Sequence, residues 1–204
     1  MAVLARRRCS SKAATQAWWK VPPKIAKSHQ ACSYDRAGYG SSDPGPDPRD
    51  GAAVAKDLDQ TLKTAKIADP CILVGHSAGA PYMRLFAVRR SRDVVGMVLV
   101  DPSIEHQDRR LAEVFGPGAG SLKGAHDRAA LYLAAAQRQA LPSSDPALKV
   151  CGQTSAGKAW QTQMSEADTL WGATSDEVSG APVVSPATPI IVLTADRTYA
   201  AAPP

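Results

Sequence analysis

The sequence predicts an α/β fold with a doubly wound, mostly parallel sheet. Three apolar runs of strand length lie at residues 71–74, 94–100 and 189–195, and the last two lead directly into Asp101 and Asp196. Continuous apolar runs of this length are typical of parallel strands that are buried on both faces. Helix-compatible segments separate the runs, and this alternation indicates crossover connections between parallel strands.

The elements before these runs follow in chain order. Residues 30–34 predict a short strand, and residues 35–43 predict a glycine-rich loop. Three prolines keep residues 44–49 in a loop, because proline lacks an N–H donor and has a fixed φ. Asp50 then serves as the N-cap of a helix. The apolar stripe of that helix has the spacing i, i+4, i+8 and i+11 and consists of Val54, Leu58, Leu62 and Ala65.

Residues 75–79 read Gly-His-Ser-Ala-Gly and stand between the run at 71–74 and a helix-compatible stretch at 81–90. A Gly-x-Ser-x-Gly pentapeptide between strand and helix is the pattern of a nucleophile elbow. Its glycines let neighbouring backbone pass close to a sharp turn, and that turn exposes the hydroxyl of Ser77. The following helix directs its unpaired N–H groups toward the reacting oxygen.

Residues 18 to about 111 resemble the core of the α/β-hydrolase fold superfamily, in its esterase-like and cofactor-free haloperoxidase-like branch. The resemblance is carried by the Asp-x-x-Gly-x-Gly loop at residues 35–40, by the elbow and by the run that ends at Asp101 and Pro102. Residues 187–199 are similar to the next strand of the same sheet. The resemblance implies a serine hydrolase that acts on a small ester or similar acyl substrate and needs no cofactor.

The resemblance also implies roles for individual residues. Ser77 attacks the acyl carbon, and the N–H of Ala78 is one donor to the oxyanion. The acid of the triad is Asp196, at the end of the later strand, or Asp101, at the end of the strand after the elbow helix. The elbow itself is shaped by its remaining residues, which are Gly75, His76 and Gly79.

A histidine base is missing from the order serine, acid, histidine that this fold uses. The sequence stops eight residues after Asp196 and has no histidine after His126. His29, His76 and His106 are, like His126, poorly placed by their positions in the sequence. Because an unactivated serine is a weak nucleophile, we expect weak or no hydrolysis from this chain. The alternative is a non-catalytic, degenerate α/β-hydrolase fragment or ligand-binding module.

The chain divides into an atypical basic segment at residues 1–17 and a single incomplete α/β-hydrolase domain at residues 18–204. No glycine precedes Gly38, so the glycine-bearing oxyanion loop that the family places before residue 18 has no counterpart. The first two edge strands of the fold are expected to be missing as well. Loss of the C-terminal strand and helices of the fold is expected to expose a sheet edge and apolar surface, so the chain should self-associate.

Residues 103–186 are too many for a simple crossover. Their position is where the resemblance to α/β-hydrolases implies a helical cap insertion over the active site. Helices are expected at residues 129–138 and 158–171. In such a cap, Trp160 and Trp171 either line an acyl or alcohol pocket or pack the cap onto the core.

Charge and composition exclude several classes of function. Residues 1–34 contain seven of the 24 basic residues and no acidic one, which leaves 17 basic and 19 acidic residues in the rest. The main domain is therefore not basic, and nucleic-acid binding is not expected. No apolar run is long enough to span a membrane. The four cysteines lack the spacing of metal ligands, so a cytoplasmic protein without a metal is expected, with Cys32 and Cys71 buried in strands.

Overall fold

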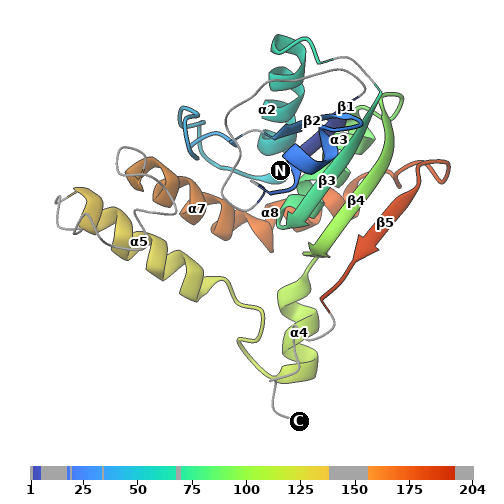
Figure 1. Ribbon diagram of the computed structural model, residues 1–204. Coiled ribbons are helices and arrows are strands. Elements are labelled where there is room, and N and C mark those ends of the chain that lie inside the picture. The colour runs from blue at the N-terminus through green and yellow to red at the C-terminus, as the bar shows by residue number, and fades with distance from the viewer. Residues whose placement is uncertain are drawn as a thin grey trace.

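The computed structural model describes residues 2–5, 18, 20–33, 35–67, 70–137 and 156–195. Its centre is a five-stranded sheet with the strand order β2-β1-β3-β4-β5 (Figure 1). The strands are β1 (Ala2–Ala5), β2 (Gln30–Ser33), β3 (Cys71–Ser77), β4 (Val94–Pro102) and β5 (Ile190–Leu193). The predicted strands at residues 30–34, 71–74, 94–100 and 189–195 are all present, and the expected α/β fold is confirmed.

Strands β3, β4 and β5 are parallel, as predicted, while β1 runs antiparallel to both of its neighbours. Leu4 of β1 pairs with Ala31 of β2 on one side and with Ile72 of β3 on the other. No strand was predicted at this position. Four apolar residues directly before three arginines are too short a signal to be distinguished from a tail.

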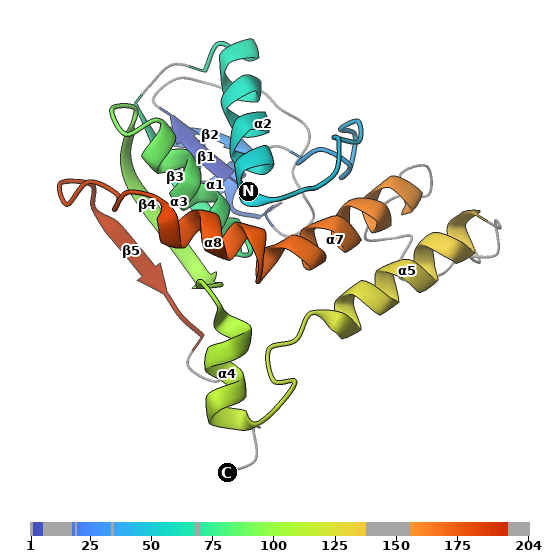
Figure 2. The ribbon, with the colours of Figure 1, turned by 180° about the vertical axis from the view of Figure 1, so that it is seen from behind.

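Three helices cover one face of the sheet (Figure 2): α2 (Gly51–Thr64), α3 (Gly79–Arg89) and α8 (Ala173–Gly180). Asp50 caps α2 as predicted, because its side chain accepts a hydrogen bond from the Ala53 N–H at 2.8 Å. The core lies between these helices and the sheet, and the two strand cysteines are buried as expected. The core includes Val54, Leu58, Leu62, Cys71, Leu73, Met83, Phe86, Met97 and Leu99. Ala65, the fourth residue of the predicted stripe, is instead the exposed C-cap of α2.

The other face of the sheet is apolar and partly open to solvent. Val95 on β4 is 48% exposed, and all four residues of β5 are between 44% and 56% exposed. The prediction that the runs at residues 94–100 and 189–195 are buried on both faces is therefore wrong. Their composition is that of doubly covered strands, but Val95 is half exposed, and β5, whose consecutive side chains point to alternate faces, is half exposed on both.

The segment between β4 and β5 is helical, with α4 (Gln107–Phe115), α5 (Lys123–Gln137), α7 (Ala156–Leu170) and α8. The helices predicted at residues 129–138 and 158–171 correspond to α5 and α7. These two lie side by side, away from the sheet (Figures 1 and 2). In contrast, α8 packs on α2 and α3, so it belongs to the layer that covers the sheet. The short helix α1 (Pro22–Ile25) contacts β2.

Candidate functional site

Ser77 is the last residue of β3, and α3 begins two residues later at Gly79. The backbone of Ser77 has φ 50°, a left-handed conformation that side chains rarely adopt. A Cβ atom at Gly75 would lie 2.7 Å from the carbonyl oxygen of Gly79. The two glycines therefore touch through their backbones, and this contact lets the chain reverse from strand into helix around a serine.

Asp101 lies beside Ser77 on the neighbouring strand. The parallel register pairs His76 with Val100 and Ser77 with Pro102, so Asp101 is skipped and forms an irregularity in β4. Its φ is 41°, and a hydrogen bond of 3.1 Å joins the Ser103 N–H to the Ser77 carbonyl just beyond it. Both candidates thus stand at the carboxyl ends of parallel strands, where ligand sites occur in such sheets. Asp196, the other candidate acid, lies outside the described residues.

Ala78 directly precedes α3 as its N-cap residue. The first N–H groups of a helix have no intrahelical partner, so this end of α3 offers donors next to Ser77.

All four histidines lie in the described part of the chain, and none forms a hydrogen bond with the hydroxyl of Ser77. The ring of His29 bonds to Ser28. His106 Nε2 lies 3.7 Å from Asp176, and His126 lies 3.5 Å from Asp168 and 3.6 Å from Asp127. His76, inside the elbow, has an exposed side chain. Among the described residues, Ser77 therefore has no histidine partner of the kind that activates a nucleophile.

A partly buried polar cluster lies between the loop after β2, the elbow helix α3 and the helix α7. The Arg36 guanidinium forms two hydrogen bonds to the Glu166 carboxylate, at 2.9 and 2.6 Å, and Tyr39 donates a third at 3.0 Å. The same guanidinium lies 4.6 Å from the centre of the Tyr39 ring and 5.7 Å from that of Tyr82. Glu166 was not predicted from the sequence, because a single acidic residue in an amphipathic helix resembles one that is exposed to solvent.

Electrostatics in this cluster follow from burial and from Glu166. Burial alone would lower the pKa of Arg36, but the adjacent carboxylate more than offsets it and raises that pKa. Burial, reinforced by the negative charge of Glu166, raises the pKa of Tyr39 and of Tyr82 far above the usual range. The hydroxyl of Tyr82 is buried without a hydrogen-bond partner among the described residues. The arginine thus stays charged and the tyrosines neutral at any ordinary pH.

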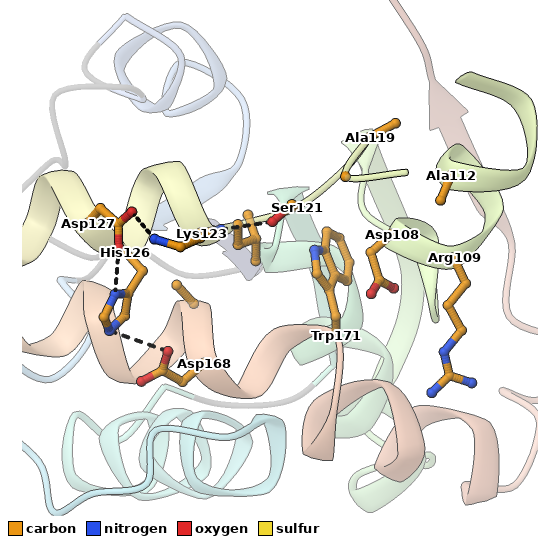
Figure 3. A pocket seen from close by; sticks show the side chains of 13 residues that line it. Asp108, Arg109, Ala112, Ala119, Ser121, Lys123, His126, Asp127, Asp168 and Trp171 are labelled. Atoms are coloured by element: carbon orange, nitrogen blue, oxygen red, sulfur yellow. Dashed lines mark hydrogen bonds and ion pairs between the residues drawn. The ribbon is translucent and has the colours of Figure 1, made fainter. Parts of the chain in front are cut away.

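A cavity of about 700 Å³ lies between α4, α5 and α7 (Figure 3). Trp171 stands in its wall, with the indole N–H donating to the Gly120 carbonyl at 2.9 Å. Asp108, His126 and Asp168 also face it, and Ser77 is not among its lining residues. In contrast, Trp160 is buried and stacks on Tyr132 of α5, with ring centres 4.9 Å apart. Each tryptophan therefore follows a different alternative: Trp160 packs α7 against α5, and Trp171 lines a cavity.

The described part of the chain holds neither a metal-binding cluster nor a membrane-spanning helix. No three side chains of histidine, cysteine, aspartate or glutamate converge there in a way that could hold a metal ion. None of the helices found there is both long and apolar enough to cross a membrane.

Comparison with known proteins places this geometry in a family. The sequence profile of the alpha/beta hydrolase family matches residues 14–204. The chain is 33% identical over 90 residues to "Uncharacterized protein YqjL" of Bacillus subtilis (strain 168), a match that covers 44% of this chain and 36% of that protein. The matched segments span between 13% and 36% of the lengths of the curated relatives.

Solved structures show the same fold at low sequence identity. The structure of the epoxide hydrolase CorEH is similar with a TM-score of 0.59 and 15% identity, over 93% of this chain and 75% of that one. An esterase from Exiguobacterium antarcticum is similar with a TM-score of 0.51 and 13% identity, over 82% and 68% of the two chains. The extent of the profile match and the shared fold lead to one conclusion: the chain belongs to the alpha/beta hydrolase family.

Proposed function

We propose that this protein is a serine hydrolase that attacks a small ester or similar acyl substrate through Ser77. The observation that carries the proposal is the strained backbone of Ser77 at the junction of β3 and α3, with Gly75 against Gly79. Backbone strain of this kind persists only where surrounding structure enforces it, and it clusters at reactive sites. The esterase among the structural neighbours is consistent with this chemistry.

The other roles follow from position. The Ala78 N–H, at the start of α3, would donate to the oxyanion of the tetrahedral intermediate. Asp101 is the acid candidate that lies beside Ser77 in the described residues, and Asp196 remains the alternative. The helices α4, α5 and α7 would form the cap, and the cavity between them would receive part of the substrate.

The described site lacks a base that could activate Ser77. Because no histidine bonds to Ser77, we expect its rate of reaction to be several orders of magnitude lower than that of a serine in a complete triad. An external base should then substitute for the missing imidazole. This expectation makes the proposal testable even in a poorly active protein.

The test is labelling of the folded chain with a fluorophosphonate, with and without added imidazole, beside Ser77→Ala. Circular dichroism confirms that both proteins are folded. We expect slow labelling that imidazole accelerates and that Ser77→Ala abolishes. Absence of labelling in the folded chain, even with imidazole, would overturn the proposal.

A second function, that of a ligand-binding module, is favoured by one observation. The cavity of about 700 Å³ is of a size that binds small molecules, yet Ser77 does not line it. If a folded but unlabelled chain still binds small esters or their products in calorimetry, the elbow is a structural feature and the cavity is the functional one.

A further inference from the structure

Helix α7 presents two faces of opposite character. One face is directed to the loop after β2 and to the start of α2, and it consists of Lys158, Thr162, Ser165, Glu166 and Thr169. The other face packs on α5 or lines the cavity, and it consists of Trp160, Met164, Ala167 and Asp168, continued by Trp171 in the turn directly after the helix. Both sets have the spacing i, i+4, i+7, i+8 and i+11, which places each on one side of a helix.

The first face docks through hydrogen bonds instead of apolar contacts. The Arg49 N–H donates to Ser165 Oγ at 2.9 Å, and Thr169 Oγ1 donates to the Arg49 carbonyl at 3.0 Å. Lys158 donates to the Ser42 carbonyl at 2.7 Å. A Cβ atom at Gly38 would collide with the Thr162 side chain, so the loop backbone lies directly on the helix.

The bidentate pair between Arg36 and Glu166 is the centre of this polar face. A buried ion pair contributes little net stability, because the loss of hydration offsets the attraction, but it is selective for one geometry. A shift of α7 by one turn would present Thr162, Gln163, Thr169 or Leu170 to the guanidinium, and none of these is a carboxylate. The pair can therefore form in one register only.

Arg36 also contacts the elbow helix. Its guanidinium lies over the ring of Tyr82, which belongs to α3, the helix that starts directly after Ser77 and Ala78. One side chain thus connects α7, whose other face forms a wall of the cavity, to the helix that positions the nucleophile candidate.

We propose that Arg36 and Glu166 are positioning residues: their pair sets the register of α7 on the loop after β2, whose Arg36 also lies over Tyr82 of the elbow helix, and so fixes the cavity wall of Ala167, Asp168 and Trp171. The role of the pair in positioning α7 follows from the geometry alone. Its effect on the reactivity of Ser77 rests on the proposed function.

Hydrogen exchange measured by mass spectrometry on the whole chain tests the proposal. In Glu166→Gln, exchange should rise about 10- to 100-fold in α7 and in residues 36–43, since a charged hydrogen-bond network is lost. Asp168→Asn is the matched control, because it removes the same charge from the other face of the same helix, at a side chain that is 63% exposed. It should leave exchange in residues 36–43 unchanged.

A double variant, Arg36→Met with Glu166→Met, distinguishes a loss of the register of α7 from a loss of overall stability as the cause of faster exchange. Apolar replacement of a buried pair often preserves thermal stability, so the midpoint of unfolding should return toward that of the parent. Exchange in α7 should nevertheless stay raised, because apolar contacts do not select one register. Unchanged exchange in Glu166→Gln, or full recovery of protection in the double variant, would overturn the positioning role. Failure of fluorophosphonate labelling in the parent chain would contradict the hydrolase proposal and leave this result intact.

Discussion

Ser77 and Asp101 lie on neighbouring parallel strands, and both are held at positive φ, 50° and 41°. The two strained residues occur where the register between β3 and β4 shifts, so one irregularity accommodates the other. Local strain of this kind costs of order 1–3 kcal/mol per residue and must be compensated by the surrounding packing. The buried core under α3 supplies that packing, with Met83 and Phe86 almost fully buried.

Relief of the strain at Ser77 should stabilise the protein. Ser77→Gly should raise the free energy of unfolding by about 1 kcal/mol relative to Ser77→Ala, because glycine alone tolerates this φ without a steric penalty. Both variants lack the hydroxyl, so their difference isolates the backbone. Thermal unfolding should show a midpoint about 2–4 °C higher for the glycine variant. Equal midpoints would mean that the serine backbone is relaxed.

The contact between Gly75 and Gly79 predicts the opposite effect for a larger residue. Gly75→Ala should destabilise the protein by about 1–3 kcal/mol, because its Cβ would meet backbone that cannot move independently of the elbow. Gly96→Ala on β4 is the control, since a Cβ there would be at 3.5 Å from Ile72, an ordinary contact. Chemical denaturation of both variants checks this. Comparable losses would contradict a specific role of the elbow glycines.

Much of the fold could be predicted because its signals are local. The strand before the elbow, the helix after it and the cap at Asp50 each depend on residues adjacent in sequence. The strand β1 could not be predicted, because its four residues become a strand only by pairing with β2 and β3. Burial was overestimated for β5, since an apolar run does not reveal how many layers cover it.

The candidate site was accessible to sequence reasoning only in part. The position of Ser77 follows from one pentapeptide, whereas its closeness to Asp101 depends on the register of two strands. The pairing of Arg36 with Glu166 joins residues 130 positions apart. Neither residue type nor local spacing distinguishes these two from ordinary surface charges, so only the folded structure identifies them.

A pH-dependent contribution to stability is expected from Asp59. Its carboxylate accepts hydrogen bonds from Lys63 at 2.6 Å and from Arg90 at 2.7 Å, and these bonds lower its pKa in the folded protein. A lowered pKa means that this stabilisation is present above the ordinary pKa near 3.8 and is lost as the pH falls through the folded value. Asp59→Asn should therefore lower the midpoint of thermal unfolding at pH 7 by about 2–4 °C, for a loss of about 1 kcal/mol.

Thermal unfolding from pH 7 to pH 2.5 checks the sign. The difference between the parent and Asp59→Asn should shrink below about pH 4. Asp43→Asn, at an exposed carboxylate without a recorded side-chain partner among the described residues, should match the parent throughout. A difference for Asp59→Asn that persists unchanged at pH 2.5 would show that its effect is not electrostatic.

We expect the chain to self-associate through β5, which is an edge strand among the described strands. Its residues Ile190–Leu193 are consecutive, apolar and about half exposed, and they pair with β4 alone among the described strands. Such an edge offers unpaired backbone groups to a like strand, and it lacks the charge or proline that commonly blocks this pairing. Such a contact would be a weak interface. Sedimentation velocity should therefore detect association at concentrations of roughly tens of micromolar or more.

Val192→Lys should reduce this association, because a charged side chain in an edge strand would have to be buried on pairing. Val183→Lys is the matched control, since Val183 lies in the loop before β5 and is 89% exposed. Both substitutions add the same charge to the same chain, so a general gain in solubility would affect them equally. Loss of association in the β5 variant alone would assign the contact to this edge. A parent chain that sediments as a monomer at all concentrations would instead mean that the half-exposed residues of β5 do not recruit a second strand.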